Sequence, residues 1–324
     1  MRNLIIVGNG LSLSIDSGFF SLSRAMQDVW EGGSITEDEK ELIRRCLPTG
    51  VDAPQNEDQL ADLQEVVDAC ETVLRFEEND RGNGDWLTET GQAFPDAIRY
   101  YVHAVASEFH SETHDTNLEP PSEFLDALNE NLLNEGSTIA TTNYDGALYR
   151  GLCDRSSFKS YTTLDGFQGN PPCFHEALRR THNKKGYYFH LHGSPLFVDD
   201  GADIRKLPRE DVRNRTPASS RHLVLTHETY KTKIIDNSEL LRAYWTKLSK
   251  LSNDFDRIVW LGHSGRDPHL NRFIARYFPA KPITIVEWNG AGNQAEREEY
   301  WKNKFSAREI KLIPMEKLTA FVDW

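Results

Sequence analysis

The first residues of the chain constrain its fold more than any other feature. Residues 3–7, Asn-Leu-Ile-Ile-Val, form a short apolar run that breaks at once into a glycine-containing turn at residues 8–12. A strand buried in a parallel sheet is covered on both faces, so its apolar residues are continuous rather than alternating. Five later segments have the same character and are expected to be strands of one sheet: residues 137–141, 187–191, 223–226, 257–261 and 283–287.

Helix-like stretches follow several of these segments. They are residues 145–153, 238–251, 268–278 and 295–305. Strands that alternate with helices favour a parallel sheet with helices on both faces. We therefore predict an α/β fold with a doubly wound, Rossmann-like parallel sheet of about six strands.

A helical pattern replaces the strand pattern between residues about 21 and 135. Leu60, Leu63, Val67, Cys70 and Leu74 are three or four residues apart, which places them on one face of a helix. Residues 94–109 and 124–133 are also expected to be helices. We predict a single domain over residues 1–324, with a core at 1–20 and 136–324 and a helical insertion at about 21–135. The charged residues 199–220 are expected to form a surface loop or lid.

Composition narrows the functional classes. Hydrophobic residues make up 38% of the chain, enough to build a core, so global disorder is excluded. The formal net charge of −13 disfavours binding of a nucleic-acid backbone over a wide face. No apolar run approaches the roughly 18 residues of a membrane span. The four cysteines form no Cys-x-x-Cys pair, which disfavours a cysteine zinc site and fits a cytoplasmic protein with reduced thiols.

Ligands of doubly wound sheets bind outside the carboxyl ends of the strands, so the residues after each strand are the candidates for a site. After the first strand, Gly8 and Gly10 allow a phosphate to approach the backbone, although a tight turn that packs strand on helix explains them equally well. After the second strand come Thr142, Asn143 and Asp145. Asp145 also suits the cap of the following helix, an interpretation that leaves Asn143 unexplained.

The later strand ends carry histidines, a serine and a carboxylate. His190 and His192 are expected to share one face of their strand, and we favour a single histidine acting as a general base over a metal pair. Ser264 stands where a nucleophile elbow carries its serine, but that motif needs a fifth-position glycine and Arg266 occupies the place. A phosphate-binding loop is therefore preferred there. Glu287 suits either ribose hydroxyls or a solvated strand end.

Four strand-end motifs, in chain order, carry a resemblance to a known family. They are Gly8-Asn9-Gly10-x-Ser12, Thr142-Asn143-Tyr144-Asp145, His192-Gly193-Ser194 and Gly262-His263-Ser264. This set resembles the sirtuin-like NAD-binding family, and more closely its bacterial branch associated with anti-phage defence, whose members hydrolyse NAD. Asn9 stands where protein deacylases carry alanine, and the cysteine pairs of their zinc ribbon are absent. The resemblance therefore implies NAD cleavage rather than deacylation.

The resemblance also implies roles for the matching residues. Asn143 and Asp145 resemble the pair that lines the nicotinamide and ribose pocket, and His192 resembles the catalytic base. The turn of Gly8, Gly10 and Ser12 resembles a diphosphate site, and Gly262, Ser264 and, as a further candidate, Glu287 resemble contacts to the adenosine half. Neighbouring residues complete the predicted NAD contacts: Asn9, Asp16, Thr142, Gly193 and His263.

The function implied is that of an NAD+ glycohydrolase, with NAD as substrate and no metal. Cleavage of the bond between nicotinamide and ribose passes through an oxocarbenium-like state, as glycoside hydrolysis does. Asp145 would supply negative charge without a strongly raised pKa, Asn143 would orient water or a ribose hydroxyl, and His192 would accept a proton. Two alternatives stay open: a sensor that binds NAD or ADP-ribose without turning it over, and a serine hydrolase that uses Ser264.

Regulation follows from the same resemblance, because an NADase that is always active would kill its host. Defence-associated relatives act with a second protein, such as an Argonaute-like protein or a HerA-type ATPase, or as homo-oligomers. We therefore expect a separate defence partner, self-assembly, or both, and a role in abortive infection.

Overall fold

The structure is a computed structural model that describes residues 1–78, 86–110, 116–153, 163–178, 186–213, 219–226, 228–305 and 309–324. Its main sheet has seven strands in the order β11-β10-β9-β1-β2-β6-β3, and each neighbouring pair is parallel. These strands are β1 (Asn3–Val7), β2 (Thr138–Thr141), β3 (Thr163–Leu164), β6 (Gly186–His190), β9 (Arg257–Leu261), β10 (Ile283–Trp288) and β11 (Ile310–Met315).

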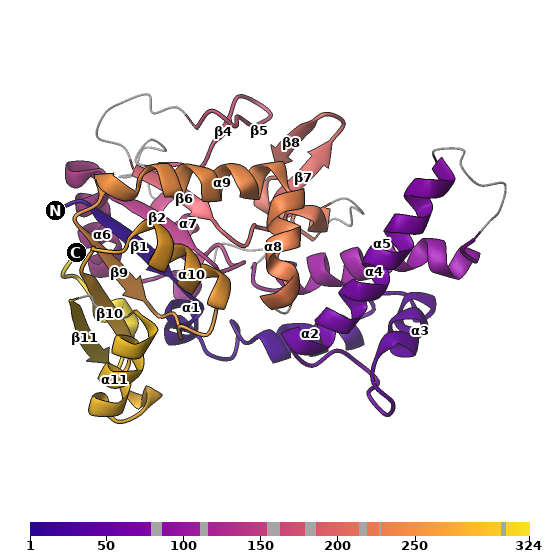
Figure 1. Ribbon diagram of the computed structural model, residues 1–324, viewed down its shortest axis with the longest axis horizontal. Coiled ribbons are helices and arrows are strands. Elements are labelled where there is room, and N and C mark those ends of the chain that lie inside the picture. Colours follow the sequence, from indigo (N-terminus) through magenta and orange to yellow (C-terminus); the bar gives the residue numbers. More distant parts are fainter. Residues whose placement is uncertain are drawn as a thin grey trace.

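Helices cover both faces of this sheet, which confirms the predicted doubly wound α/β fold (Figure 1). On one face pack α9 (Glu239–Lys250), α10 (Pro268–Tyr277) and α11 (Gln294–Lys304). On the other face pack α1 (Gly10–Ile15), α6 (Ser122–Glu135) and α7 (Ala147–Cys153). The site therefore rests on a sheet that is buried from both sides.

The apolar run at the start of the chain forms β1, which is buried on both faces as its sequence predicts. Leu4 and Ile6 pack in the core between the sheet and α9, whereas Ile5 and Val7 pack in the core on the opposite face. All four side chains are at most 1% exposed. Because both faces of β1 are covered, both sets of alternating residues have to be apolar.

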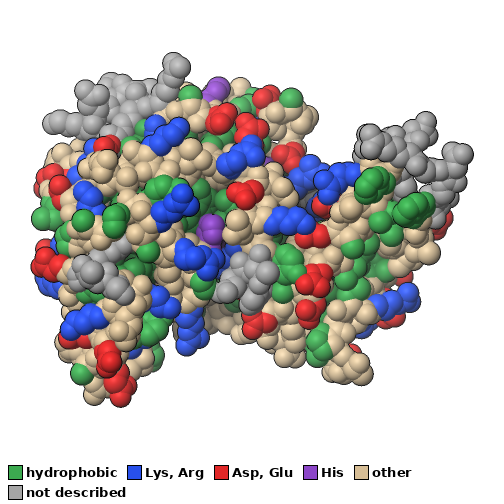
Figure 2. Space-filling view, viewed as in Figure 1, with side chains coloured by type: hydrophobic (Ala, Val, Ile, Leu, Met, Phe, Trp, Pro, Cys, Tyr) green, Lys and Arg blue, Asp and Glu red, His purple; other side chains and the backbone are tan. Residues whose placement is uncertain are grey.

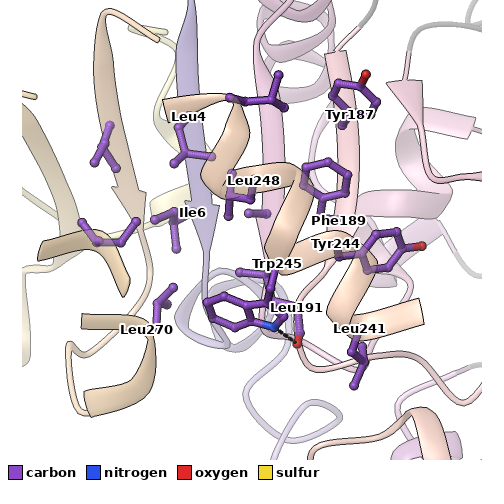
Figure 3. Close-up of a cluster of buried hydrophobic side chains, with 14 of the residues drawn as sticks. Leu4, Ile6, Tyr187, Phe189, Leu191, Leu241, Tyr244, Trp245, Leu248 and Leu270 are labelled. Atoms are coloured by element: carbon purple, nitrogen blue, oxygen red, sulfur yellow. Dashed lines mark hydrogen bonds between the residues drawn. The ribbon is translucent and has the colours of Figure 1, made fainter. Parts of the chain in front are cut away.

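Aromatic residues fill much of the first of these cores. Figure 3 shows Leu4 and Ile6 of β1 close to Leu248 and Trp245 of α9, with Phe189 of β6 nearby. The indole Nε1 of Trp245 donates a hydrogen bond of 3.1 Å to Leu191 O, so this buried polar atom is satisfied. The bond also ties α9 to the segment that leads from β6 into the site.

Five of the six predicted strands are present, but the prediction for residues 223–226 is wrong. Leu223 and Leu225 pack in the core of the helical insertion, while Val224 packs in the core of the sheet. This segment is apolar because it runs between two cores. Within the described residues, its strand pairing is limited to an isolated antiparallel bridge between Leu223 and Gly193. The sequence interpretation also missed β11, an edge strand that is partly exposed and contains Pro314, which an edge position tolerates.

The insertion contains α2 (Leu22–Glu31), α3 (Glu37–Cys46), α4 (Glu57–Glu78) and α5 (Glu89–Ser107). These helices lie beside the sheet rather than on it and share a core of their own (Figure 1). Leu60, Leu63 and Val67 of α4 are buried in that core, as their spacing predicts. By contrast, α6 packs on the sheet, where its leucines join the β1 core.

A small antiparallel sheet lies outside the main one, with the order β4-β5-β8-β7. Its strands are β4 (Phe167–Gln168), β5 (Cys173–Phe174), β7 (Phe197–Asp200) and β8 (Asp203–Lys206). The prediction of a loop over residues 199–220 is therefore wrong for residues 199–206, which form a hairpin, and residues 214–218 lie outside the described residues. One further helix, α8 (Glu228–Asn237), directly precedes α9 in the chain. None of the helices in the described ranges combines the length and apolarity that crossing a bilayer requires.

Candidate active site

A cavity of about 370 Å³ lies where the loops after β9, β1, β2 and β6 meet. The chain runs outward from β1 in both directions of the strand order, so the cavity is at the switch point where doubly wound sheets bind ligands. The insertion adds Leu22, Glu57 and Phe109 to its walls. The other lining residues are Asn9, Gly10, Leu13, Thr142, Asn143, Tyr144, Asp145, His192, Lys231, Gly262, His263, Ser264, Arg266 and Asp267.

The glycine-containing loops after β1 and β9 pack directly against each other. Gly10 N donates a hydrogen bond of 2.7 Å to Gly262 O, and a Cβ added at Gly10 would lie 2.5 Å from that same oxygen. A Cβ at Gly8 would lie 2.7 Å from His263 Cα. Gly262 has a φ of 62°, a conformation that glycine adopts without strain. These glycines are therefore needed for loop packing, whichever ligand the cavity binds.

Ser12, Asn143 and Asp145 form a buried hydrogen-bond chain in the wall of the cavity. Asn143 Nδ2 donates to Ser12 Oγ at 3.1 Å and to Gly8 O at 3.2 Å, and Ser12 Oγ donates to Asp145 Oδ2 at 2.7 Å. These two acceptors orient the amide. Asn143 Oδ1 is left buried with no hydrogen-bond partner among the described residues. An unpaired buried acceptor beside a cavity calls for water or a ligand group.

Both carboxylate oxygens of Asp145 are engaged, because Oδ1 accepts a hydrogen bond of 3.0 Å from Ala147 N at the start of α7. The helix-capping interpretation of Asp145 is thus also correct. Burial raises the pKa of Asp145, while the hydrogen bonds from Ser12 and Ala147 N act in the opposite direction. This raised pKa differs from the sequence expectation, which did not foresee how completely the carboxylate is buried.

His192 lies beside a carboxylate and a lysine in the lining of the cavity. Its Nε2 lies 3.2 Å from Asp267 Oδ2, and Lys231 Nζ donates to that same oxygen at 3.2 Å. Burial lowers the pKa of His192, and the Asp267 carboxylate only partly offsets this effect. The imidazole is therefore neutral at pH 7, which is the protonation state that a general base requires.

The structure separates His190 from His192. The strand β6 ends at His190, so the alternation of side chains does not continue to His192. His190 is surrounded by Tyr149, Tyr188 and Phe197, with ring centroids 5.5, 4.9 and 5.3 Å away, and burial lowers its pKa to about 3. His190 lies in this aromatic environment, outside the cavity lining.

Nine of the predicted site residues line the cavity, and Ser12 is joined to them by hydrogen bonds. Gly193 does not line it: with a φ of 83°, this residue lets its backbone approach His222 O, which a Cβ would overlap at 1.5 Å. The nine are Asn9, Gly10, Thr142, Asn143, Asp145, His192, Gly262, His263 and Ser264.

Two predicted carboxylates are engaged elsewhere. Glu287 is buried and accepts hydrogen bonds from Arg297 at 2.6 and 2.9 Å and from Trp301 Nε1 at 3.0 Å. Asp16 Oδ1 accepts from Phe19 N at 2.7 Å, at the end of α1. Neither side chain lines the cavity.

Ser264 lines the cavity, but its surroundings do not match those of a nucleophile. Its Oγ accepts a hydrogen bond of 3.3 Å from Arg266 N, and no histidine among the described residues is hydrogen-bonded to it. The adjacent His263 uses Nδ1 to accept from Gly265 N at 3.0 Å. The serine–histidine pair of a serine hydrolase is thus not formed within the described residues.

Sequence reasoning missed Asp267 and Lys231. Asp267 had a signal, because an aspartate before Pro268 is typical of a helix start, and its Oδ1 indeed accepts from Leu270 N at 3.0 Å. Lys231 had none, since its place in the site depends on how α8 packs beside α10.

A larger cavity of about 570 Å³ lies between α4, α5 and α8. Figure 2 shows a hollow between the body that carries the sheet and the insertion helices, with Lys and Arg side chains along it. The charges that line this cavity largely pair with one another: Arg99 contacts Glu71 and lies 3.0 Å from Asp96, and Lys233 pairs with Asp68. The 370 Å³ cavity, where the buried Asn143 Oδ1 lacks a partner among the described residues, is the better candidate site.

A comparison with protein-family models matches residues 137–307 to the SIR2-like domain, which is more than half of the 324 residues. The chain belongs to the SIR2-like family. The match covers Asn143, Asp145, His192 and the loop after β9, and it confirms the resemblance to sirtuin-like proteins. SIR2-like domains are NAD-utilising enzymes, so the family implies an NAD-related function. No curated protein matches the chain.

Proposed function

We propose that the chain is an NAD+ glycohydrolase that cleaves the bond between nicotinamide and ribose. The observation that carries this proposal is the orientation of Asn143. Its amide hydrogens are used by Ser12 and Gly8, and its buried Oδ1 has no partner among the described residues. That oxygen is held ready to accept a hydrogen bond from the attacking water or from a ribose hydroxyl.

The neutral His192 acts as the proton acceptor. Asp267 lies against Nε2, which leaves Nδ1 to take the proton from the water as it attacks the ribose carbon. Because the imidazole is buried and unprotonated at neutral pH, it needs no activating step before it accepts this proton.

Asp145 contributes mainly by orientation. Its oxygens accept from Ser12 and from Ala147 N, and the carboxylate thereby fixes Ser12 and, through it, Asn143. When ionised, it also favours the positive charge that develops on the sugar in an oxocarbenium-like state. Nicotinamide departs as a neutral molecule, so the reaction requires no general acid.

We further propose that the enzyme depletes NAD as an effector of bacterial anti-phage defence. NAD consumption has to be restrained in a healthy cell, and the insertion forms part of the cavity wall through Leu22, Glu57 and Phe109. A separate partner or self-assembly that acts on the insertion would therefore act on the site as well.

The test is to incubate the purified chain with NAD and to measure nicotinamide release, for the wild type and for Asn143→Ala and His192→Ala. Each substitution is expected to reduce turnover at least ~10²-fold, the usual effect of removing a positioning group or a general base. Asn289→Ala and His175→Ala, at exposed positions away from the cavity, serve as matched controls.

A loss smaller than this in a folded Asn143 or His192 variant would contradict the assigned roles. Saturable NAD binding by the wild type without nicotinamide release would instead favour a sensor that binds NAD or ADP-ribose.

A further inference from the structure

Two side chains compete for one carboxylate oxygen beside the proposed base. Lys231 Nζ and His192 Nε2 each lie 3.2 Å from Asp267 Oδ2, and the lysine donates a hydrogen bond to this oxygen. The side chains of all three residues are at most 9% exposed. Asp267 Oδ1 is occupied by Leu270 N, so Oδ2 is the oxygen that the two groups share.

The position of Lys231 is set by helix packing. It lies on α8, where the neighbouring Thr232 Oγ1 is 3.2 Å from His269 Nδ1 on α10. On its other side, Lys231 Nζ lies 3.8 Å from Glu57 Oε2, at the first residue of α4. The ammonium group is therefore buried between a carboxylate of the sheet-bearing body and one of the insertion.

The groups around His192 explain what this lysine does. Asp267 attracts a proton to His192, whereas Lys231 repels one, and His263 and His269 would repel one if they were charged. A buried carboxylate with no other cation would share its charge with the imidazole alone and favour the imidazolium. Lys231 offsets that attraction.

We propose that Lys231 is a positioning residue of this site, which holds Asp267 Oδ2 in place and keeps His192 unprotonated at neutral pH. This inference rests on the proposed function in one respect only, namely that His192 acts as the base. The electrostatic part concerns the folded protein and is independent of NAD cleavage.

The distances set the size of the effect. Because both nitrogens lie 3.2 Å from the same oxygen, they are no more than about 6.4 Å apart. A unit charge at that separation, with the effective dielectric constant of about 20 found in proteins, shifts the pKa of its neighbour by about 2 units. Removing the lysine charge should raise the pKa of His192 by that amount.

The first measurement is an NMR pH titration of the histidine Cε1–H signals in the full chain, with the His192 signal assigned from His192→Gln. We expect Lys231→Met to raise the pKa of His192 by about 2 units. Lys231→Arg, which keeps the charge, should leave the pKa close to that of the wild type. Lys233→Met, two residues along α8 and paired with Asp68 outside the site, is the matched control and should cause no shift.

The second measurement is the pH dependence of kcat/KM for NAD, whose acidic limb should move upward by the same interval in Lys231→Met. If the wild type cleaves no NAD, the proposed reaction fails, and the NMR titration still decides the role of the lysine. Lys231→Gln, which keeps a hydrogen-bond donor without the charge, provides the same test if the methionine variant does not fold. The inference is overturned if a folded, uncharged variant leaves the pKa of His192 within about 0.3 units of the wild type.

Discussion

Ser12→Ala isolates the hydrogen-bond chain that orients Asn143. The hydroxyl of Ser12 donates to Asp145 Oδ2 at 2.7 Å and accepts from Asn143 Nδ2 at 3.1 Å, and all three residues are buried. Alanine removes both bonds and leaves Asp145 with Ala147 N as its remaining donor.

The expected loss of stability follows from these two bonds. A hydrogen bond to a charged acceptor contributes about 1.5 to 3 kcal/mol and a neutral one about 0.5 to 1.5 kcal/mol, so the free energy of unfolding should fall by roughly 2 to 4.5 kcal/mol at pH 7.5. Turnover of NAD should also fall, because the side-chain amide of Asn143 then keeps a single hydrogen bond among the described residues, to Gly8 O.

The loss should depend on pH, and its sign can be worked out. Burial already raises the pKa of Asp145, and removal of the Ser12 donor raises it further. A carboxylate with a raised folded-state pKa destabilises the protein at high pH, and this effect is relieved as the pH falls through the folded-state pKa. The difference between Ser12→Ala and the wild type should therefore be largest at pH 7.5 and smaller at pH 5.

Urea unfolding followed by tryptophan fluorescence at the two pH values measures this difference. Ser14→Ala is the matched control, because Ser14 Oγ donates at 2.9 Å to a backbone carbonyl, Leu11 O, whose charge does not change with pH. A loss in Ser12→Ala that is independent of pH and no larger than that of Ser14→Ala would refute the reasoning.

Two further predictions concern buried groups outside the Ser12 chain. Burial lowers the pKa of His110 and His263 to about 4 and that of His190 to about 3, so the unfolded chain binds more protons below pH 6.5. The free energy of unfolding should therefore decrease by up to about 4 kcal/mol for each unit by which the pH is lowered near pH 5. Urea midpoints that stay constant from pH 7 to pH 5 would contradict this. Glu287→Gln should lower the free energy of unfolding by about 1 to 3 kcal/mol through loss of the charged pair with Arg297, and it should leave the KM for NAD within about twofold of the wild type. A large rise in the KM for NAD would instead support the predicted contact between Glu287 and the ribose hydroxyls.

The sequence predicts the sheet well because its signal is local. Each central strand is buried on both faces, so a continuous apolar run marks it without knowledge of its neighbours, as Leu4 to Val7 of β1 illustrate. The same signal fails at residues 223–226, which are just as apolar because Leu223 and Val224 enter two different cores. Periodicity and composition cannot tell these two environments apart.

The site residues likewise fall into those that local sequence signals predict and those that depend on tertiary packing. Asn143, Asp145 and His192 follow directly from strand ends, and the parallel sheet brings strand ends together. Lys231 depends instead on how one helix packs against another. Glu287 shows that a position at a strand end does not by itself place a side chain in the site. Its carboxylate is instead bound by Arg297 and Trp301 of α11.

The cavity is therefore built from two sources with separate cores. The sheet supplies the proposed reacting groups, and the insertion closes one side with Leu22, Glu57 and Phe109, while its own core is distinct from those of the sheet. Leu223 and Leu225, just before α8, are buried in the core of the insertion. Because α8 then delivers Lys231 to Asp267, a shift of the insertion relative to the sheet would change the surroundings of the proposed base without any change in the sheet itself.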